Sequence, residues 1–185
     1  MKILADSLEI LQQGGSICYP TDTVWGLGCD ATNKEAVAQI YQIKNRESSK
    51  SLIILVSDKT MLKEYVSEIP ENLEAILDKE NRPVSVIYPG AKNLAPNVIA
   101  EDGSVAIRIV QDAFCQEMIK SFGKPIVSTS ANISGEPTPK SYKEISSRVL
   151  DKVNYVINLR TEEINSKSSK IIRLLSDNTV EVIRE

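Results

Sequence analysis

The sequence contains no histidine. This absence excludes Ser-His-Asp and Cys-His nucleophile systems, zinc sites with histidine ligands, and acid–base catalysis by imidazole. Any chemistry must therefore use lysine, arginine, hydroxyl groups, carboxylates, backbone amides or a metal ion that arrives from outside the chain.

Cysteines and long apolar runs are also scarce. The three cysteines, Cys18, Cys29 and Cys115, form no Cys-x-x-Cys pair, which argues against a disulfide framework and a zinc site and favours buried, reduced thiols. The longest apolar stretch, Leu52–Val56, is too short to span a membrane, and the first residues do not read as a signal peptide. We therefore expect a cytoplasmic protein with no membrane partner.

Length and charge set further bounds. The 185 residues, of which 42% are hydrophobic, suit a single domain over residues 1–185. The net charge of −3 gives neither the overall basic character typical of nucleic-acid-binding proteins nor a polybasic membrane signal.

Helix and strand patterns alternate along the chain. Leu4, Leu8 and Leu11 share a helical face that ends at Gly14-Gly15, and Thr32–Glu35 has the capping-box pattern of a helix start. Further helices are expected at 71–79, 114–122 and 142–150, strands at 16–19, 52–56, 84–88, 105–109, 126–127, 155–159, 171–175 and 180–183, and a long surface loop at 91–103. This order predicts an α/β fold with a mixed sheet and helices packed against it.

Two segments match nucleotide-binding motifs only in part. Gly26–Ala31 fits G-x-G-x-x-A, but six residues separate it from the preceding strand and the helix signal comes after it. Gly135–Ser141 lacks one glycine of a P-loop, and its prolines remove amide donors that a phosphate would need. We expect neither a Rossmann nor a Walker site.

Three polar segments are candidates for a site. Tyr19–Gly28 places hydroxyls and glycines at a strand end, where open α/β sheets bind ligands, although its hydroxyls could instead satisfy their own turn. Lys44–Ser51 carries three cations, which suit phosphate oxygens or, alternatively, a helix dipole and solvent. Ser128–Gly135 is dense in hydroxyl and amide side chains, which fits a ligand site or a hydroxyl-rich turn.

Two polar residues interrupt apolar strands. Arg108 lies within Val105–Ile109, where it faces solvent or forms a carboxylate clamp at the sheet edge. Ser85 lies within Val84–Tyr88 and fits a small hydroxyl that faces the core.

Taken together, these segments resemble the YrdC-like family, and within it the single-domain threonylcarbamoyl-AMP synthases. The family pattern is Y-P-T-D-T-V-x-G-L-G, K-x-R, an apolar strand, V-A-x-R, and S-x-N followed by S-G. The matching residues are Tyr19–Gly28, Lys44 and Arg46, Leu52–Val56, Val105–Arg108, and Ser130 and Asn132 with Ser134-Gly135. The resemblance extends over nearly the whole chain.

The resemblance implies a twisted, mixed but mostly parallel sheet with flanking helices around a concave, positively lined cavity. It implies that L-threonine, bicarbonate and ATP, with Mg²⁺, form threonylcarbamoyl-AMP and pyrophosphate. A partner transferase would then carry the threonylcarbamoyl group to an adenosine of tRNA, and double-stranded RNA or tRNA is a further implied partner. Such a transfer depends on positioning and charge neutralisation more than on a protein nucleophile.

The resemblance also assigns roles to individual residues. Lys44 and Arg46 are the expected catalytic residues at the triphosphate. The expected nucleotide-binding residues are Lys44, Arg46, Lys50, Ser85, Ser130, Asn132, Ser134, Ser168 and Arg184. The expected threonine-binding residues are Thr23, Arg108 and Ser128, and protein side chains alone form no metal site.

The chain departs from the family pattern at several positions. Trp25 stands where tyrosine is usual, Arg82 where glycine is usual, and Ser85 where threonine is usual. Val110 replaces a proline, and Lys170 replaces a hydroxyl residue. The prolines that usually follow K-x-R are also missing.

Two other functions fit the same pattern. One is a YciO-like or carbamoyl-adenylate-forming paralogue, which would use ATP without threonine. The other is an RNA-binding module of the same fold, which would show a steep salt dependence of RNA affinity and no ATP turnover.

Overall fold

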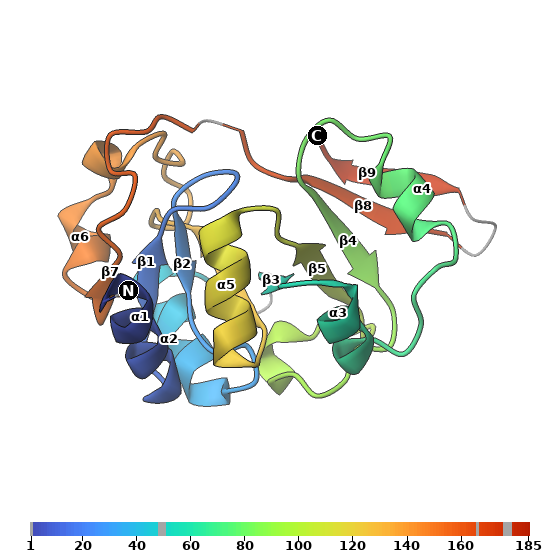
Figure 1. Ribbon diagram of the computed structural model, residues 1–185, viewed down its shortest axis with the longest axis horizontal. Helices are drawn as coiled ribbons and strands as arrows, with labels where there is room; N and C mark the ends of the chain where they lie inside the picture. Colours follow the sequence, from blue (N-terminus) through green and yellow to red (C-terminus); the bar gives the residue numbers. More distant parts are fainter. Residues whose placement is uncertain (1, 48–50, 166, 176–178) are drawn as a thin grey trace.

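A computed structural model describes residues 2–47, 51–165, 167–175 and 179–185 (Figure 1). The helices are α1 (Lys2–Gln12), α2 (Lys34–Lys44), α3 (Lys59–Tyr65), α4 (Leu73–Leu77), α5 (Ala113–Phe122) and α6 (Ser147–Leu150), with short 3₁₀ turns η1 (Pro96–Val98) and η2 (Tyr142–Glu144). The strands are β1 (Ile17–Tyr19), β2 (Gly26–Gly28), β3 (Ile53–Val56), β4 (Val84–Tyr88), β5 (Val105–Ile109), β6 (Ile126–Ser130), β7 (Tyr155–Val156), β8 (Lys170–Leu174) and β9 (Val180–Arg184).

The strands of the described residues form one mixed sheet in the order β7-β1-β2-β6-β3-β5-β4-β8-β9. This confirms the expected α/β class with a mixed sheet. The pairs β1–β7, β3–β5 and β4–β8 are parallel, whereas β1–β2, β2–β6, β6–β3, β5–β4 and β8–β9 are antiparallel. The expectation that parallel pairs predominate was wrong, because β2 and β6 enter the centre of the sheet as antiparallel strands.

The two faces of the sheet belong to different cores. Val127 of β6 and Ile54 of β3 face a large core that includes residues of α2, whereas Ile126 and Leu55 face a smaller core that includes residues of α1 and α5. Successive side chains of a strand point to opposite faces. Ser128 therefore follows Ile126 on the face of α1 and α5, and the sheet presents polar groups there beyond the end of the apolar core.

Several local expectations are corrected by the structure. Residues 26–28 form a strand rather than part of a loop. The cap of α2 is Asn33, whose side chain accepts hydrogen bonds from the backbone N–H groups of Glu35 and Ala36, and not Thr32. Thr32 instead donates its hydroxyl to Asp30 at 2.6 Å.

Other elements differ from expectation in their extent or were not expected at all. A helix at 59–65 was not expected, and the helix expected at 142–150 is a 3₁₀ turn followed by one short helix. Ala95 and Val98 are buried in the large core, so 91–103 is not simply a surface loop. The hairpin turn expected at 176–178 lies outside the described residues.

Gly28 ends β2, which lies between β1 and β6, and both neighbouring strands pack too closely against it to admit a side chain. A Cβ atom at this position would lie 2.7 Å from the carbonyl oxygen of Val127 and 2.8 Å from the Tyr19 ring. Backbone cannot shift away cheaply there, because it belongs to the sheet ladder.

The remaining global expectations concern thiols and membranes. The cysteines are free and buried, as expected, and burial raises the pKa of Cys18 to about 12. Within the described part of the chain, no helix combines the length and apolar character needed to cross a bilayer.

Candidate active site

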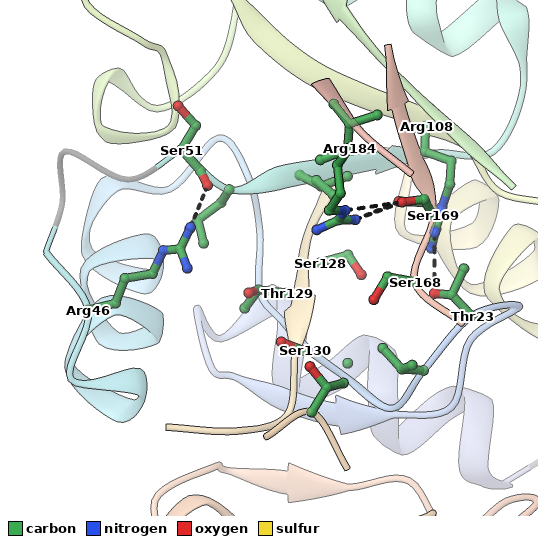
Figure 2. A pocket seen from close by; sticks show the side chains of 16 residues that line it. Thr23, Arg46, Ser51, Arg108, Ser128, Thr129, Ser130, Ser168, Ser169 and Arg184 are labelled. Carbon is green, nitrogen blue, oxygen red and sulfur yellow. Dashed lines mark hydrogen bonds between the residues drawn. The ribbon is translucent and has the colours of Figure 1, made fainter. Parts of the chain in front are cut away.

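A polar cavity of about 210 Å³ is lined by residues of β2, β3, β5, β6, β8 and β9 and of the segments that precede or follow them (Figure 2). Its wall holds three arginines and a set of hydroxyl side chains. The lining residues are Thr23, Val24, Gly26, Arg46, Ser51, Leu52, Ile53, Arg108, Ser128, Thr129, Ser130, Thr138, Ser168, Ser169, Ile171 and Arg184. Figure 2 shows Arg46 and Ser51 on one side of the cavity and Arg184, Ser169, Arg108 and Thr23 on the other.

Arg108 extends from β5 and is buried, with 4% of its side chain exposed. One guanidinium nitrogen lies 3.0 Å from Asp22 Oδ1, and another donates to Thr23 Oγ1 at 3.3 Å. Thr23 is held in turn by Thr21, whose hydroxyl lies 2.9 Å away and also donates to the carbonyl of Val24. The loop between β1 and β2 therefore fixes Arg108 at the cavity wall.

Arg184 reaches the same wall from the C-terminal strand β9. Its guanidinium donates to the carbonyl of Ser169 at 2.8 Å and to the Ser169 hydroxyl at 3.3 Å. Burial lowers the pKa of Arg184, and the nearby charges of Arg108 and Arg82 lower it further. Positive charge thus accumulates on this side of the cavity, where it favours an anionic ligand.

Ser85 lies behind this wall. It is fully buried, and its hydroxyl lies 2.9 Å from the hydroxyl of Ser169. Ser85 therefore supports Ser169, which itself lines the cavity.

Arg46 forms the opposite side, just after α2. The turn after α2 uses Asn45 in the left-handed conformation, with φ 48°, so that the chain reverses toward β3. The Arg46 guanidinium donates to the carbonyl of Ser51 at 3.0 Å, next to the start of β3. Its planar fork of donors suits phosphate oxygens.

Lys44 is buried beneath the end of β6, with 1% of its surface exposed. Its ammonium donates to the carbonyls of Ser130 at 2.6 Å and Asn132 at 2.8 Å, and to Asn132 Oδ1 at 3.3 Å. The Lys44 carbonyl accepts from the Ser134 N–H at 2.7 Å, so Lys44 holds the 130–134 turn from both ends. Burial lowers the pKa of Lys44 to about 8, and the charge of Arg46 acts in the same direction.

Asn132 completes this turn. Its Oδ1 accepts from the Ser130 hydroxyl at 2.5 Å, and its Nδ2 donates to the carbonyl of Glu136 at 2.7 Å. Ser130 lines the cavity, whereas Asn132 is not among the lining residues. The amide therefore orients the Ser130 hydroxyl at the cavity wall.

A second cavity of about 300 Å³ adjoins the first and shares Thr23 and Ser168 with it. Arg82 and Lys167 bring further positive charge, and Asp22 brings a carboxylate. No carboxylate lines the first cavity among the residues that the structure describes. Over those same residues, no group of three or more acidic or cysteine side chains is arranged to hold a metal ion.

A family model described as "Telomere recombination", which covers the Sua5, YciO and YrdC proteins, matches residues 9–185 of the chain. The chain belongs to the Sua5/YciO/YrdC family. This finding confirms the resemblance inferred from the polar segments and accounts for the shared order of the motifs.

Curated relatives from this family carry an enzyme name. A protein of Vibrio campbellii named threonylcarbamoyl-AMP synthase is 31% identical over 183 residues, which are 94% of this chain and 99% of that protein. A protein of Stenotrophomonas maltophilia with the same name is 34% identical over 155 residues, covering 80% of this chain and 81% of that protein.

Solved structures of the Sua5/YciO/YrdC family share the fold. Sua5 of P. abyssi in complex with L-threonine superposes with a TM-score of 0.84 at 25% identity, over 99% of this chain and 53% of that chain. The chain therefore spans about half the length of that Sua5 protein. YciO of E. coli superposes with a TM-score of 0.85 at 24% identity, over 100% of this chain and 89% of that chain, which shows a common fold.

The structure brings most of the family-derived site residues together. The expected residues that line the cavity are Arg46, Ser130, Ser168, Arg184, Thr23, Arg108 and Ser128. The expected residues that do not line it are Lys44, Ser85, Asn132 and Ser134. Lys44 and Asn132 hydrogen-bond to Ser130, Ser85 to Ser169, and Ser134 to Lys44. Lys50 lies outside the described residues.

Sequence reasoning missed other residues at the site. Ser169 and Thr138 line the cavity, and Asp22 pairs with Arg108 at its edge. Ser169 was adjacent to a candidate but carried no separate signal, since its contact with Ser85 depends on the pairing of β8 with β4. Asp22 stood within the first polar segment, where its partner across the fold could not be read.

Proposed function

We propose that this chain is a threonylcarbamoyl-AMP synthase, which forms threonylcarbamoyl-AMP and pyrophosphate from L-threonine, bicarbonate and ATP. The observation that carries the proposal is the cavity wall, in which Arg46, Arg108 and Arg184 surround hydroxyl side chains. Such a wall fits a ligand with several anionic groups. The shared name of the curated relatives supports the same activity.

The reaction suits a chain without histidine. The amine of threonine and bicarbonate form a carbamate with loss of water. A carbamate oxygen then attacks the α-phosphorus of ATP, the bond to the β-phosphate oxygen breaks, and pyrophosphate leaves with its electron pair. The protein must hold the reactants in line and stabilise negative charge, and arginines and hydroxyls perform both tasks.

The two sides of the cavity divide the substrates. Arg46 and Ser130 would bind the triphosphate. Arg184, which lies on the same wall as Arg108, would contact the nucleotide from that side together with Ser168. Lys44 would act at this end together with Asn132 and Ser134, through the turn that they form. Ser85 would act through Ser169, and Lys50 remains a proposed phosphate contact outside the described residues.

Threonine would occupy the other side. Arg108 offers its guanidinium to the α-carboxylate, while Thr23 and Ser128 offer hydroxyls to the side chain and the carbamate. Sua5 of P. abyssi forms a complex with L-threonine, which supports a threonine site here. ATP would enter as its magnesium complex, because the phosphates themselves carry the ion.

We propose that the adenylate passes to a transferase that modifies an adenosine of tRNA. This step follows from the chemistry of the product, since a mixed anhydride of a carbamate and AMP is a reactive acyl donor. Direct contact with RNA is a further proposal that the cations at Arg82 and Lys167, beside the second cavity, would serve.

Pyrophosphate release tests the function. The full chain is incubated with MgATP, with L-threonine and bicarbonate each present or omitted. Release that requires both supports the synthase. Release without threonine supports the paralogue activity instead. Arg46→Ala should lose release, whereas Lys152→Ala, which removes an exposed cation after α6, should not.

A further inference from the structure

Arg108 is a buried cation within a group of cations. It lines the same cavity as Arg184, and the two are close enough that Arg108 lowers the pKa of Arg184, after the larger effect of burial. A buried guanidinium needs a counter-charge and hydrogen-bond partners, because the loss of hydration is otherwise uncompensated. The burial of the Arg108 guanidinium therefore requires a neighbouring carboxylate.

Asp22 is that carboxylate. Its Oδ1 lies 3.0 Å from an Arg108 nitrogen, and 11% of the Asp22 side chain is exposed. Its Oδ2 accepts from the backbone N–H of Gln111 at 3.0 Å. Gln111 follows the strand that carries Arg108, so the carboxylate is anchored to the same stretch of backbone as the guanidinium that it faces.

The guanidinium is held along one edge and open along another. Asp22 contacts Nη2, and Thr23 accepts from Nη1. Among the described residues, Arg108 Nε and Asp22 Oδ1 are both buried without a hydrogen-bond partner, so the contact between Asp22 and Nη2 is an ion pair rather than a hydrogen bond. A buried donor without a partner points to an acceptor that the cavity receives from a ligand.

We propose that Asp22 is a positioning residue that fixes the Arg108 guanidinium in the orientation that binds the carboxylate of threonine. This inference rests on the proposed function for the identity of the ligand. Asp22 is not among the residues that line the first cavity, and in this proposal it acts through Arg108.

A positioning role and a purely electrostatic role predict opposite effects on ligand binding when Asp22 is neutralised. If Asp22 only offset the charge of its neighbour, its neutralisation would strengthen the positive field and tighten binding of an anionic group. If Asp22 fixes the guanidinium, the same change weakens binding, because the amide of asparagine sets N–H groups against those of arginine and Arg108 turns away.

The experiment compares Asp22→Asn with Asp58→Asn. Asp58 caps α3 by accepting from the Met61 N–H, and asparagine is an equally good cap, so the control makes the same chemical change away from the cavity. We expect Asp22→Asn to raise the KM for threonine on the order of 10- to 100-fold. The KM for ATP should stay within about twofold, and the control should match the wild type.

A lower or unchanged KM for threonine would overturn the positioning role. Equal rises for both substrates would also overturn it, because they would indicate general damage to the fold. If Asp22→Asn does not fold, Asp22→Ser removes the charge with a smaller side chain and takes its place in the same comparison.

A second measurement separates this inference from the proposed function. In the nitrogen-15-labelled chain, the Arg108 Nε–H resonance, assigned with Arg108→Lys, should be protected from exchange in the wild type and lose protection in Asp22→Asn. Wild type that releases no pyrophosphate would contradict the proposed function alone. Equal protection in the two chains would contradict the role of Asp22.

Discussion

Replacement of Lys44 by methionine should reduce pyrophosphate release on the order of 100-fold while leaving the stability of the chain near that of the wild type at pH 7. The pKa of Lys44, lowered by burial from 10.5 to about 8, corresponds to a penalty of about 3 kcal/mol for keeping the ammonium charged in the folded state. Against this stand the hydrogen bonds to Ser130 and Asn132, which contribute about 1 kcal/mol each, or about 3 kcal/mol together. Methionine removes both contributions and fills a similar volume.

The effect on activity should be much larger. Without the ammonium, the carbonyls of residues 130 and 132 lose their donor, and the turn that places the Ser130 hydroxyl at the cavity relaxes. A shift of about 1 Å in a positioned group can reduce the rate on the order of 100-fold. Pyrophosphate release and urea unfolding, measured on Lys44→Met and on the Lys152→Ala control, check the two halves of this prediction.

The pH dependence of the unfolding free energy gives a second test of the prediction for Lys44→Met. Below pH 8 Lys44 is charged in both the folded and the unfolded state, so the cost of burying its ammonium fully opposes folding. Between pH 8 and 10.5 the folded state gives up its proton first, the unfolded state binds more protons, and stability rises with pH. Lys44→Met lacks this gain, so the wild type should become more stable than the variant by about 2 kcal/mol at pH 9.5.

Two results would refute the reasoning. Pyrophosphate release within about twofold of the wild type would show that the turn does not depend on Lys44. A stability difference that stays constant from pH 7 to pH 9.5 would show that burial does not lower the pKa of Lys44. Other titrating groups are common to both chains and cancel in the comparison.

Further predictions concern the other parts of the account. Arg46→Ala should raise the KM for ATP on the order of 10-fold or more with little change in unfolding free energy, as read by steady-state kinetics and urea unfolding; unchanged ATP kinetics would remove Arg46 from the triphosphate site. Asn33→Ala should lower the unfolding free energy by about 1 kcal/mol, because α2 loses its cap, and unaltered stability would contradict that assignment. Gly28→Ala should lower the melting temperature markedly, because its methyl group would meet the Val127 carbonyl at about 2.7 Å; an unshifted melting curve would show that β1 and β6 can separate.

Elements with strong local signals were predictable. The helix that ends at Gly123 ends there in the structure, with the glycine in the left-handed conformation at φ 74°. The strands at 84–88 and 105–109 were bounded correctly. Residues 26–28 were missed as a strand because two glycines carry no strand signal, and their strand character comes from pairing with β1 and β6.

The candidate site was likewise predictable from the sequence only in part. Candidate residues such as Ser128 and Ser130 followed from the density of hydroxyls at a strand end, and the structure places both at the cavity. The burial of Lys44 and Arg108 was not readable, because charged residues are usually exposed and their acceptors lie across the fold. The pairing of Arg108 with Asp22 depends on bringing residues 22 and 108 together, which only the folded sheet does.

The most direct test of the proposed activity is identification of the product. The full chain is incubated with MgATP, L-threonine and isotope-labelled bicarbonate, and the nucleotides are separated and identified by mass spectrometry. We expect threonylcarbamoyl-AMP that carries the label of bicarbonate, formed in proportion to pyrophosphate and lost in Arg46→Ala. An adenylate that lacks threonine, or pyrophosphate released without any labelled adenylate, would contradict the account.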